Sequence, residues 1–316
     1  MERWHDFDPK QGGSPSQHYA WGSLESTEYA TQEHFAFDEY WHRNGVAGDE
    51  ALIKRCQEKR PDMIFLLWVP VPPHMTPAVE TLNILRNKLS IPIVALHTDA
   101  IWPEQLAWAE QIAPYMEISI IQSHHTWIKD VKDPRKHMTL WPVQDPRVFY
   151  NPRLARNIDL SFLGAMSDYA RHPERWDGLR TLKEAGIPVY HRGGVREDNI
   201  PVSDYARIFM YSKISLNFSQ VGPYHAPKGR IFEMGNCGAM MMEPFSPETL
   251  CYFIPMMDYV PYYSLEDLLD KVRFYLKHDS EREEIAERMY EKATTIYSAK
   301  RYWKFLIERA TGKKLV

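Results

Sequence analysis

The sequence predicts an α/β protein that consists of two tandem doubly wound, Rossmann-like domains followed by a helical tail. Two blocks of the chain alternate short apolar runs with amphipathic helical segments, a pattern that is typical of βαβ units and parallel sheets. The stretch Gln144–Asn157, which holds two Pro and three Arg, separates the blocks, and beyond Ser264 only helical patterns remain. We therefore predict one domain over residues 1–150 and a second over residues 151–316.

The first block has regular elements from residue 49 onward. The near-continuous apolar run Met63–Trp68 lies between two prolines and is typical of a strand that is buried on both faces of a parallel sheet. The other expected elements are strands at 91–97, 118–122 and 138–143 and helices at 49–59, 76–89, 103–112 and 124–131. The first forty residues mix aromatic and polar side chains without a clear period, so no element is assigned to them.

The second block repeats the alternation and then becomes helical. Its expected strands are 158–163, 187–190, 214–218 and 239–242, and its expected helices are 173–185, 203–212, 228–236, 265–277, 280–294 and 300–310. The last helix, at about 297–311, is expected to cross back to the N-terminal domain because Tyr302, Trp303, Phe305 and Leu306 need burial. Open α/β sheets bind ligands outside the carboxyl ends of their strands, so we expect the site in a cleft between the domains.

Composition argues against several classes of protein. The formal net charge is −4 over 316 residues, which disfavours a general nucleic-acid coat. Cys56, Cys237 and Cys251 have no CxxC spacing, so a zinc site or a disulfide framework is not expected. The sequence shows no apolar leader, and its longest apolar run is far shorter than the ~20 residues that a membrane span needs. We therefore expect a cytoplasmic protein with no membrane span.

The stretch from Tyr211 to Glu243 carries the most chemical information. It is predicted as a strand, a loop and a helix, with Lys228 and Arg230 at the start of the helix. A helix N-terminus already favours anions, and two cations beside it would bind a diphosphate. Glu233, about one turn further on, could accept hydrogen bonds from the vicinal hydroxyls of a ribose. The alternative is that Glu233 pairs with Arg230 or Lys228 on a solvated helix face.

Several motifs in this region carry a family resemblance. They are the strand Ser215-Leu216-Asn217, the Arg-x-Phe-Glu helix at 230–233, the Cys-Gly-Ala turn at 237–239, the run Tyr262–His278 and the pair Ile285-Ala286. With these motifs the chain resembles the donor-binding half of glycosyltransferase-B-fold (GT-B) enzymes and is most similar to the CgeB-like spore-maturation group. The similarity is specific from about residue 158 to 301. By contrast, the sequence patterns of Rossmann dehydrogenases, P-loop NTPases, G-x-S-x-G hydrolases and HExxH metalloproteases are absent.

The resemblance implies transfer of a sugar from a nucleotide-sugar donor, with a UDP-sugar as the expected donor, to an acceptor hydroxyl. It implies that Glu233 holds the donor ribose, that Arg230 faces the diphosphate, and that Gly164 lets the backbone approach the phosphates. Arg171 is a further candidate cation. Retaining relatives carry an E-x7-E signature, but the position of its first Glu is His225 here, which changes the residue beside the donor sugar. No cofactor and no obligatory metal are expected, because this fold handles the leaving diphosphate with backbone amides and cations.

The N-terminal half supplies the candidates for acceptor chemistry. Asp99 lies at the predicted end of a strand, where it could act as the general base; His97 could do so instead, or Asp99 could cap the next helix. His124 and His125 end the next strand and face the same choice. The acceptor is not defined by the sequence. Two other functions stay open: a non-catalytic nucleotide-sugar-binding protein, and a phage-type enzyme that glycosylates DNA.

Overall fold

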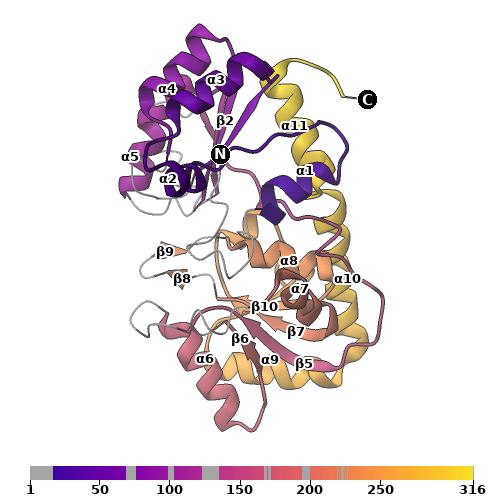
Figure 1. The fold of residues 1–316 in the computed structure, drawn as a ribbon. Helices are drawn as coiled ribbons and strands as arrows, with labels where there is room; N and C mark the ends of the chain where they lie inside the picture. The colour runs from indigo at the N-terminus through magenta and orange to yellow at the C-terminus, as the bar shows by residue number, and fades with distance from the viewer. Residues whose placement is uncertain are drawn as a thin grey trace. The chain divides into compact units, whose positions relative to one another are not determined.

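The structure is a computed structural model of the 316-residue chain. It describes residues 17–68, 76–98, 103–122, 135–166, 169, 172–193, 200–218, 220–221, 224–225 and 227–315. Contacts within the chain divide it into one unit of residues 1–141 with 299–316 and a second unit of residues 142–298. Each unit contains a parallel sheet with helices (Figure 1), which confirms the predicted α/β class.

The first unit is built on a four-stranded parallel sheet in the order β1-β2-β3-β4. Its strands are β1 (Ile64–Trp68), β2 (Ile93–Thr98), β3 (Ile118–Gln122) and β4 (His137–Met138). Its helices are η2 (Gln17–Gly22), α1 (Ser23–Glu25), α2 (Phe37–Asn44), α3 (Asp49–Lys59), α4 (Val79–Asn83), η4 (Ile84–Lys88), α5 (Pro103–Ile112), η5 (Ala113–Tyr115) and α11 (Ala299–Thr311). The helix predicted at 76–89 is thus shorter and ends in a π-helical turn, and the one predicted at 124–131 lies outside the described residues.

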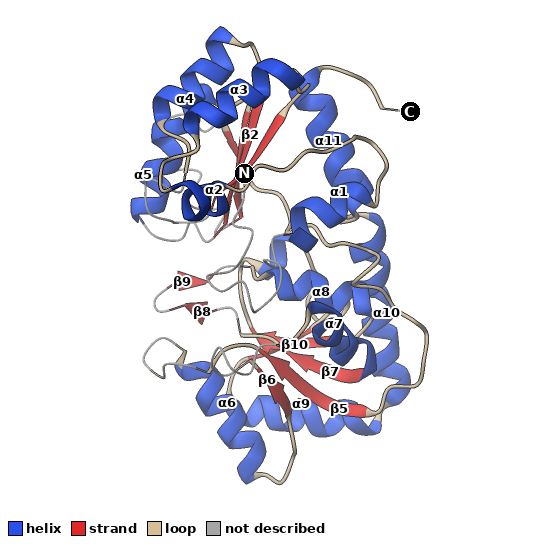
Figure 2. Cartoon of the chain, in the orientation of Figure 1, coloured by secondary structure: helices blue, strands red, loops and turns tan. Residues whose placement is uncertain are grey.

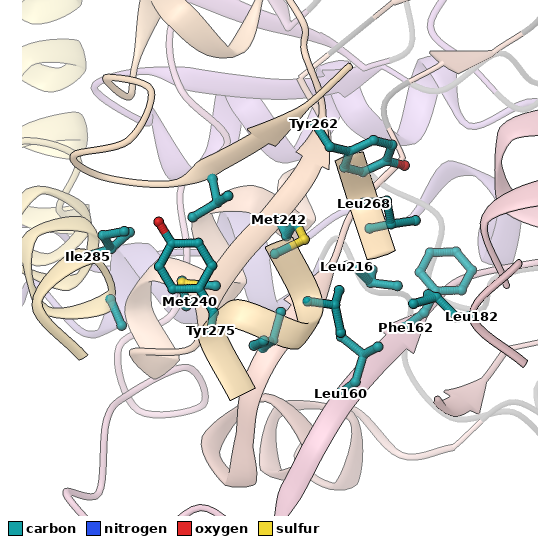
Figure 3. Packing of buried hydrophobic residues seen from close by; sticks show 14 of the residues in the cluster. Leu160, Phe162, Leu182, Leu216, Met240, Met242, Tyr262, Leu268, Tyr275 and Ile285 are labelled. Carbon is teal, nitrogen blue, oxygen red and sulfur yellow. The ribbon is translucent and has the colours of Figure 1, made fainter. Parts of the chain in front are cut away.

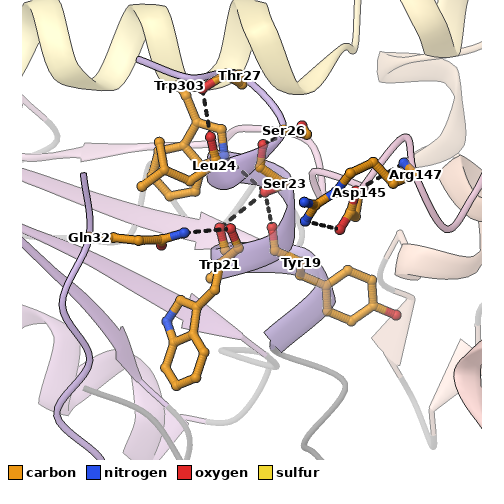
Figure 4. A network of polar contacts seen from close by, with 11 residues as sticks. Tyr19, Trp21, Ser23, Leu24, Ser26, Thr27, Gln32, Asp145, Arg147 and Trp303 are labelled. Carbon is orange, nitrogen blue, oxygen red and sulfur yellow. Dashed lines mark hydrogen bonds and ion pairs between the residues drawn. The ribbon is translucent and has the colours of Figure 1, made fainter. Parts of the chain in front are cut away.

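The C-terminal helix α11 belongs to the first unit by its contacts. The ring of Trp303 lies 4.9 Å from that of Phe65 on β1, and Tyr302 packs edge-on against Trp141. Figure 4 shows the Trp303 indole N–H donating to the Ser23 hydroxyl over 2.9 Å. This is the helix that the sequence predicts to cross back to the N-terminal domain. The first forty residues, to which the sequence analysis assigns no helix or strand, therefore include Ser23, a hydrogen-bond partner of α11.

The second unit is built on a five-stranded parallel sheet in the order β11-β10-β7-β5-β6. A separate two-stranded antiparallel ribbon, β8-β9, occurs between β7 and α8 in the chain. The strands of this unit are β5 (Ile158–Leu163), β6 (Tyr190–Arg192), β7 (Ser212–Leu216), β8 (Gln220–Val221), β9 (Tyr224–His225), β10 (Met240–Pro244) and β11 (Val260–Tyr262). Its helices are α6 (Pro173–Glu184), α7 (Val202–Tyr211), α8 (Gly229–Cys237), η8 (Thr249–Cys251), α9 (Leu265–Lys277) and α10 (Asp279–Thr295). The predictions missed β11 and the ribbon, and they placed β6 too early.

Helices cover both faces of this sheet, as doubly wound topology requires (Figure 2). One face is apolar: Phe162, Leu216 and Met242 belong to one buried cluster that also includes Leu268 of α9 and Ile285 of α10 (Figure 3). Alternate residues face α7 and α8 on the other side. Burial on both faces explains the near-continuous apolar strands of the sequence.

The stretch predicted as a linker is packed into the second unit. Phe149 is fully buried and its ring lies edge-on to that of Tyr205. Gln144 donates to the backbone oxygen of Gly229 at the start of α8. Consequently the chain divides after Trp141, earlier than the boundary at residue 150 that composition suggests.

Candidate functional site

The second sheet has a topological switch between its strands β5 and β7. From β5 the chain moves to the edge strand β6, and it then returns to β7 on the other side of β5. Open α/β sheets bind ligands at such a point, outside the carboxyl ends of the strands. Gly164 directly follows β5 and Asn217 directly follows β7. The expected ligand site of this unit therefore lies at these two residues.

Arg230, in the first turn of α8, reaches this switch point. Its Nη1 donates to Oδ1 of Asn217 over 2.9 Å, and its guanidinium carbon lies 5.5 Å from the centre of the Phe162 ring. A Cβ atom on Gly164 would lie only 2.9 Å from Arg230 Nη2, so the missing side chain makes room for the guanidinium. The family resemblance implies instead that Gly164 lets the backbone approach the phosphates, a role that stays a prediction. Lys228 is the N-cap residue of the same helix.

Arg175 is a second cation at this place, and the sequence reasoning missed it. It lies in the first turn of α6, is 5% exposed, and donates from Nη1 to the backbone oxygen of Ala165 over 2.7 Å. Burial and then the nearby Arg230 lower its pKa to about 10. The expected cation of this loop was Arg171, which lies outside the described residues. A usable signal existed, since Arg175, like Arg230, is an arginine in the first turn of a helix that follows a strand and a loop.

Two carboxyl groups accompany the two arginines. Glu243, at the end of the apolar strand β10, is fully buried and accepts a hydrogen bond of 2.6 Å from Asn217 Nδ2. Glu174 precedes Arg175 on α6, and burial followed by repulsion from Glu243 raises its pKa to about 7. The carboxyl end of the sheet thus combines two guanidinium groups with one buried carboxylate and one readily protonated carboxyl group.

Glu233 does not lie on a solvated helix face, as the alternative interpretation expected, but in a buried position. The residue is 1% exposed, and its Oε2 accepts a hydrogen bond of 2.6 Å from the Tyr205 hydroxyl of α7. Burial and then the Glu233 charge raise the pKa of Tyr205 well above its usual range. The carboxylate is therefore fixed before any ligand binds, and a substitution to alanine would also disturb this pair.

The first unit presents His97 near the carboxyl end of β2. His97 is 1% exposed, and neither ring nitrogen has a hydrogen-bond partner among the described residues. Burial and then His137 lower its pKa to about 3. A general base must reach its substrate and have a pKa near the working pH, so His97 in this conformation is unsuited to that role.

The other predicted site residues are described only in part. Asp99, His124 and His125 lie outside the described residues, as does Arg171. The backbone of His225 pairs with that of Gln220 in the ribbon β8-β9. Within the described part of the chain no three His, Cys, Asp or Glu side chains form a potential metal cluster. No described helix combines the length and apolar character that a membrane crossing requires.

Comparisons with known proteins bear on the family and the fold of the chain. A family model described as "Glycosyl transferase-like" matches residues 151–308, which is half of the chain. No curated protein matches the sequence. HepE from Anabaena, solved in complex with UDP, has a TM-score of 0.59 at 12% identity, with 84% of this chain and 82% of that chain covered.

Two further solved structures have the same fold. TarM of S. aureus has a TM-score of 0.56 at 8% identity and covers 83% of this chain and 58% of its own. The pneumococcal O-GlcNAc transferase GtfA, in complex with UDP and GlcNAc, has a TM-score of 0.53 at 10% identity and covers 85% and 61%. These likenesses confirm the fold class that the sequence predicts.

Proposed function

The chain belongs to the glycosyl transferase-like family, and we propose that it transfers a sugar from a UDP-sugar to an acceptor hydroxyl. The observation that carries this proposal is the pair of arginines, Arg175 and Arg230, at the switch point of the second sheet. The complexes of HepE and GtfA with UDP support the choice of nucleotide. The motifs at 215–239 and 262–286 favour the CgeB-like group within the family.

We assign the donor diphosphate to the two arginines, with Lys228 beside them. Burial first and the nearby Arg230 second lower the pKa of Arg175, and a bound dianion would favour the charged form of both arginines. As the bond between the sugar and the diphosphate breaks, negative charge grows on the departing diphosphate. Fixed cations stabilise this charge without a metal ion. The N-terminus of α8 adds partial positive charge at the same place.

We assign the donor ribose to Glu233. Tyr205 holds the carboxylate of Glu233 by a hydrogen bond, so the packing of α7 against α8 sets the orientation of the two carboxylate oxygens. Hydrogen bonds from hydroxyls to a carboxylate contribute about 1.5–3 kcal/mol each. We place acceptor activation on Asp99 rather than His97, and His225 beside the donor sugar.

The proposal is tested by isothermal titration of UDP and 2′-deoxy-UDP into wild type and variants. Glu233→Gln keeps the size of the side chain but removes its charge, and we expect UDP to bind at least ~10-fold more weakly. The affinity for 2′-deoxy-UDP should fall less, because one of the hydroxyls is missing. Arg230→Ala should weaken both ligands alike, since it acts on the diphosphate.

The matched control is Tyr205→Phe. It removes the Tyr205–Glu233 hydrogen bond, which the amide oxygen of the Glu233→Gln variant could still accept, but it leaves the carboxylate in place, so UDP affinity should change by no more than a few-fold. If Glu233→Gln and Tyr205→Phe had equal effects, Glu233 would serve only the packing of α7 and α8. UDP affinity that is unchanged in both Glu233→Gln and Arg230→Ala would refute the donor site.

A further inference from the structure

We propose that Glu243 and Asn217 are positioning residues that hold Arg230 in the orientation required by the donor diphosphate. This inference rests on the proposed function, because it takes Arg230 as a diphosphate ligand. The three residues come from different elements of the second unit: the end of β10, the end of β7 and the first turn of α8. Hydrogen bonds link them in one chain.

The chain of hydrogen bonds has a defined polarity. Asn217 donates from Nδ2 to Oε2 of Glu243 over 2.6 Å, and its Oδ1 accepts from Nη1 of Arg230 over 2.9 Å. A carboxylate only accepts and a guanidinium only donates, so the reversed amide would place like groups against each other at both ends. The amide of Asn217 therefore has a single orientation, and it connects the negative charge of Glu243 to the positive charge of Arg230.

The chain of contacts is also rigid. Asn217 and Glu243 are both fully buried, and the backbone N–H of Asn217 donates to the oxygen of Met242 over 2.9 Å. That bond continues the pairing of β7 with β10 and fixes the spacing of the two side chains. A buried carboxylate at the end of an otherwise apolar strand costs free energy unless it is compensated. The hydrogen bond from Asn217, and the cation of Arg230 beyond it, supply compensation of this kind.

Arg230 is held on two sides as a result. Asn217 binds Nη1, and Nη2 lies against Gly164 in the space where a Cβ atom would be. The Nε atom of Arg230 is buried and has no hydrogen-bond partner among the described residues. The plane of the guanidinium is thus set before a ligand binds, which lowers the entropy that binding must overcome.

The test is a double-mutant cycle measured by titration with UDP. Asn217→Ala should weaken UDP about 10-fold, the loss expected when one hydrogen bond to a charged group no longer orients the guanidinium. Glu243→Gln should weaken it less, because the glutamine oxygen can still accept from Asn217. In the Arg230→Ala background, Asn217→Ala should have no further effect on UDP affinity, because Asn217 acts through Arg230.

The matched control is Ser215→Ala, two residues earlier on β7. The buried Ser215 hydroxyl bonds with that of Ser161 over 2.8 Å, so its loss removes a buried hydrogen bond from the same strand without touching Arg230. We expect the UDP affinity of this variant to equal that of wild type. The near-isosteric Glu243→Gln keeps the test decisive if Asn217→Ala does not fold.

The outcomes separate the two proposals. If Arg230→Ala weakens UDP but Asn217→Ala and Glu243→Gln do not, the positioning role is wrong and the donor site stands. Equal losses from Asn217→Ala in the wild-type and Arg230→Ala backgrounds would likewise show that Asn217 acts independently of Arg230. Unchanged affinity in Arg230→Ala would overturn both the positioning role and the diphosphate site.

Discussion

Arg156 connects the carboxyl ends of α7 and α8, which carry residues of the proposed donor site, and its replacement by lysine tests how these two helices are held. Its Nη1 donates to the backbone oxygens of Phe209, Met210 and Ser212 at the end of α7, over 3.0, 2.9 and 2.9 Å. Its Nη2 donates to the oxygen of Cys237 at the end of α8, over 2.9 Å. One planar guanidinium therefore satisfies the last carbonyl groups of both helices.

The magnitude follows from the number of carbonyl groups that would lose their donor. A lysine ammonium keeps the charge but has no planar fork, so it cannot reach both helix ends from one position. At least two buried acceptors would lose a partner, and each such loss costs about 1–3 kcal/mol. We expect Arg156→Lys to lower the free energy of unfolding by about 2–6 kcal/mol.

The assay is urea denaturation of each variant, combined with hydrogen exchange of peptides from α7 and α8. Arg153→Lys is the control: Arg153 is three residues earlier and pairs with Glu287, but its side chain is 58% exposed. An exposed pair contributes about 0–1 kcal/mol, so this control should remain close to wild type. If Arg156→Lys were as mild as Arg153→Lys, or if exchange in α7 and α8 did not increase, the capping role of Arg156 would be refuted.

Two further predictions concern the charges of the donor site. Glu174 has a pKa raised from 4.5 to about 7, first by burial and then by Glu243, so the folded protein binds more protons than the unfolded chain in this range. Its contribution to stability is complete below pH 4.5 and is lost as the pH rises through 7; Glu174→Gln should flatten that part of a pH series of urea midpoints, and an unchanged profile would contradict the assignment. If Arg230 and Arg175 neutralise the diphosphate as we propose, glycosyl transfer should persist in EDTA; complete loss of activity that manganese restores would show that a metal does so instead.

The sequence by itself determined most of the longer strands and helices, and the glycosyl transferase-like family. Strands such as Ile93–Thr98 are buried on both faces, and their sequences are therefore nearly continuous apolar runs. Helix ends can also be recognised, because Gly186 and Gly238 occupy positions with a positive φ, which glycine favours. The cations at the start of α8 could also be found, because a strand, a loop and a helix start are local patterns. These features depend only on residues that are close in the chain.

Only the tertiary structure decided which side chains meet. Asn217 and Glu243 are 26 positions apart and Tyr205 and Glu233 are 28 apart, and each pair comes together because of the order of strands and the packing of α7 against α8. Periodicity shows which face of an element is buried but not which partner lies opposite, so the burial of Glu233 and the approach of Arg175 to Arg230 were not predictable. The strand β11 was missed for a related reason: it has three residues, too few to show a period, and it is stabilised by pairing with β10 rather than by its own sequence.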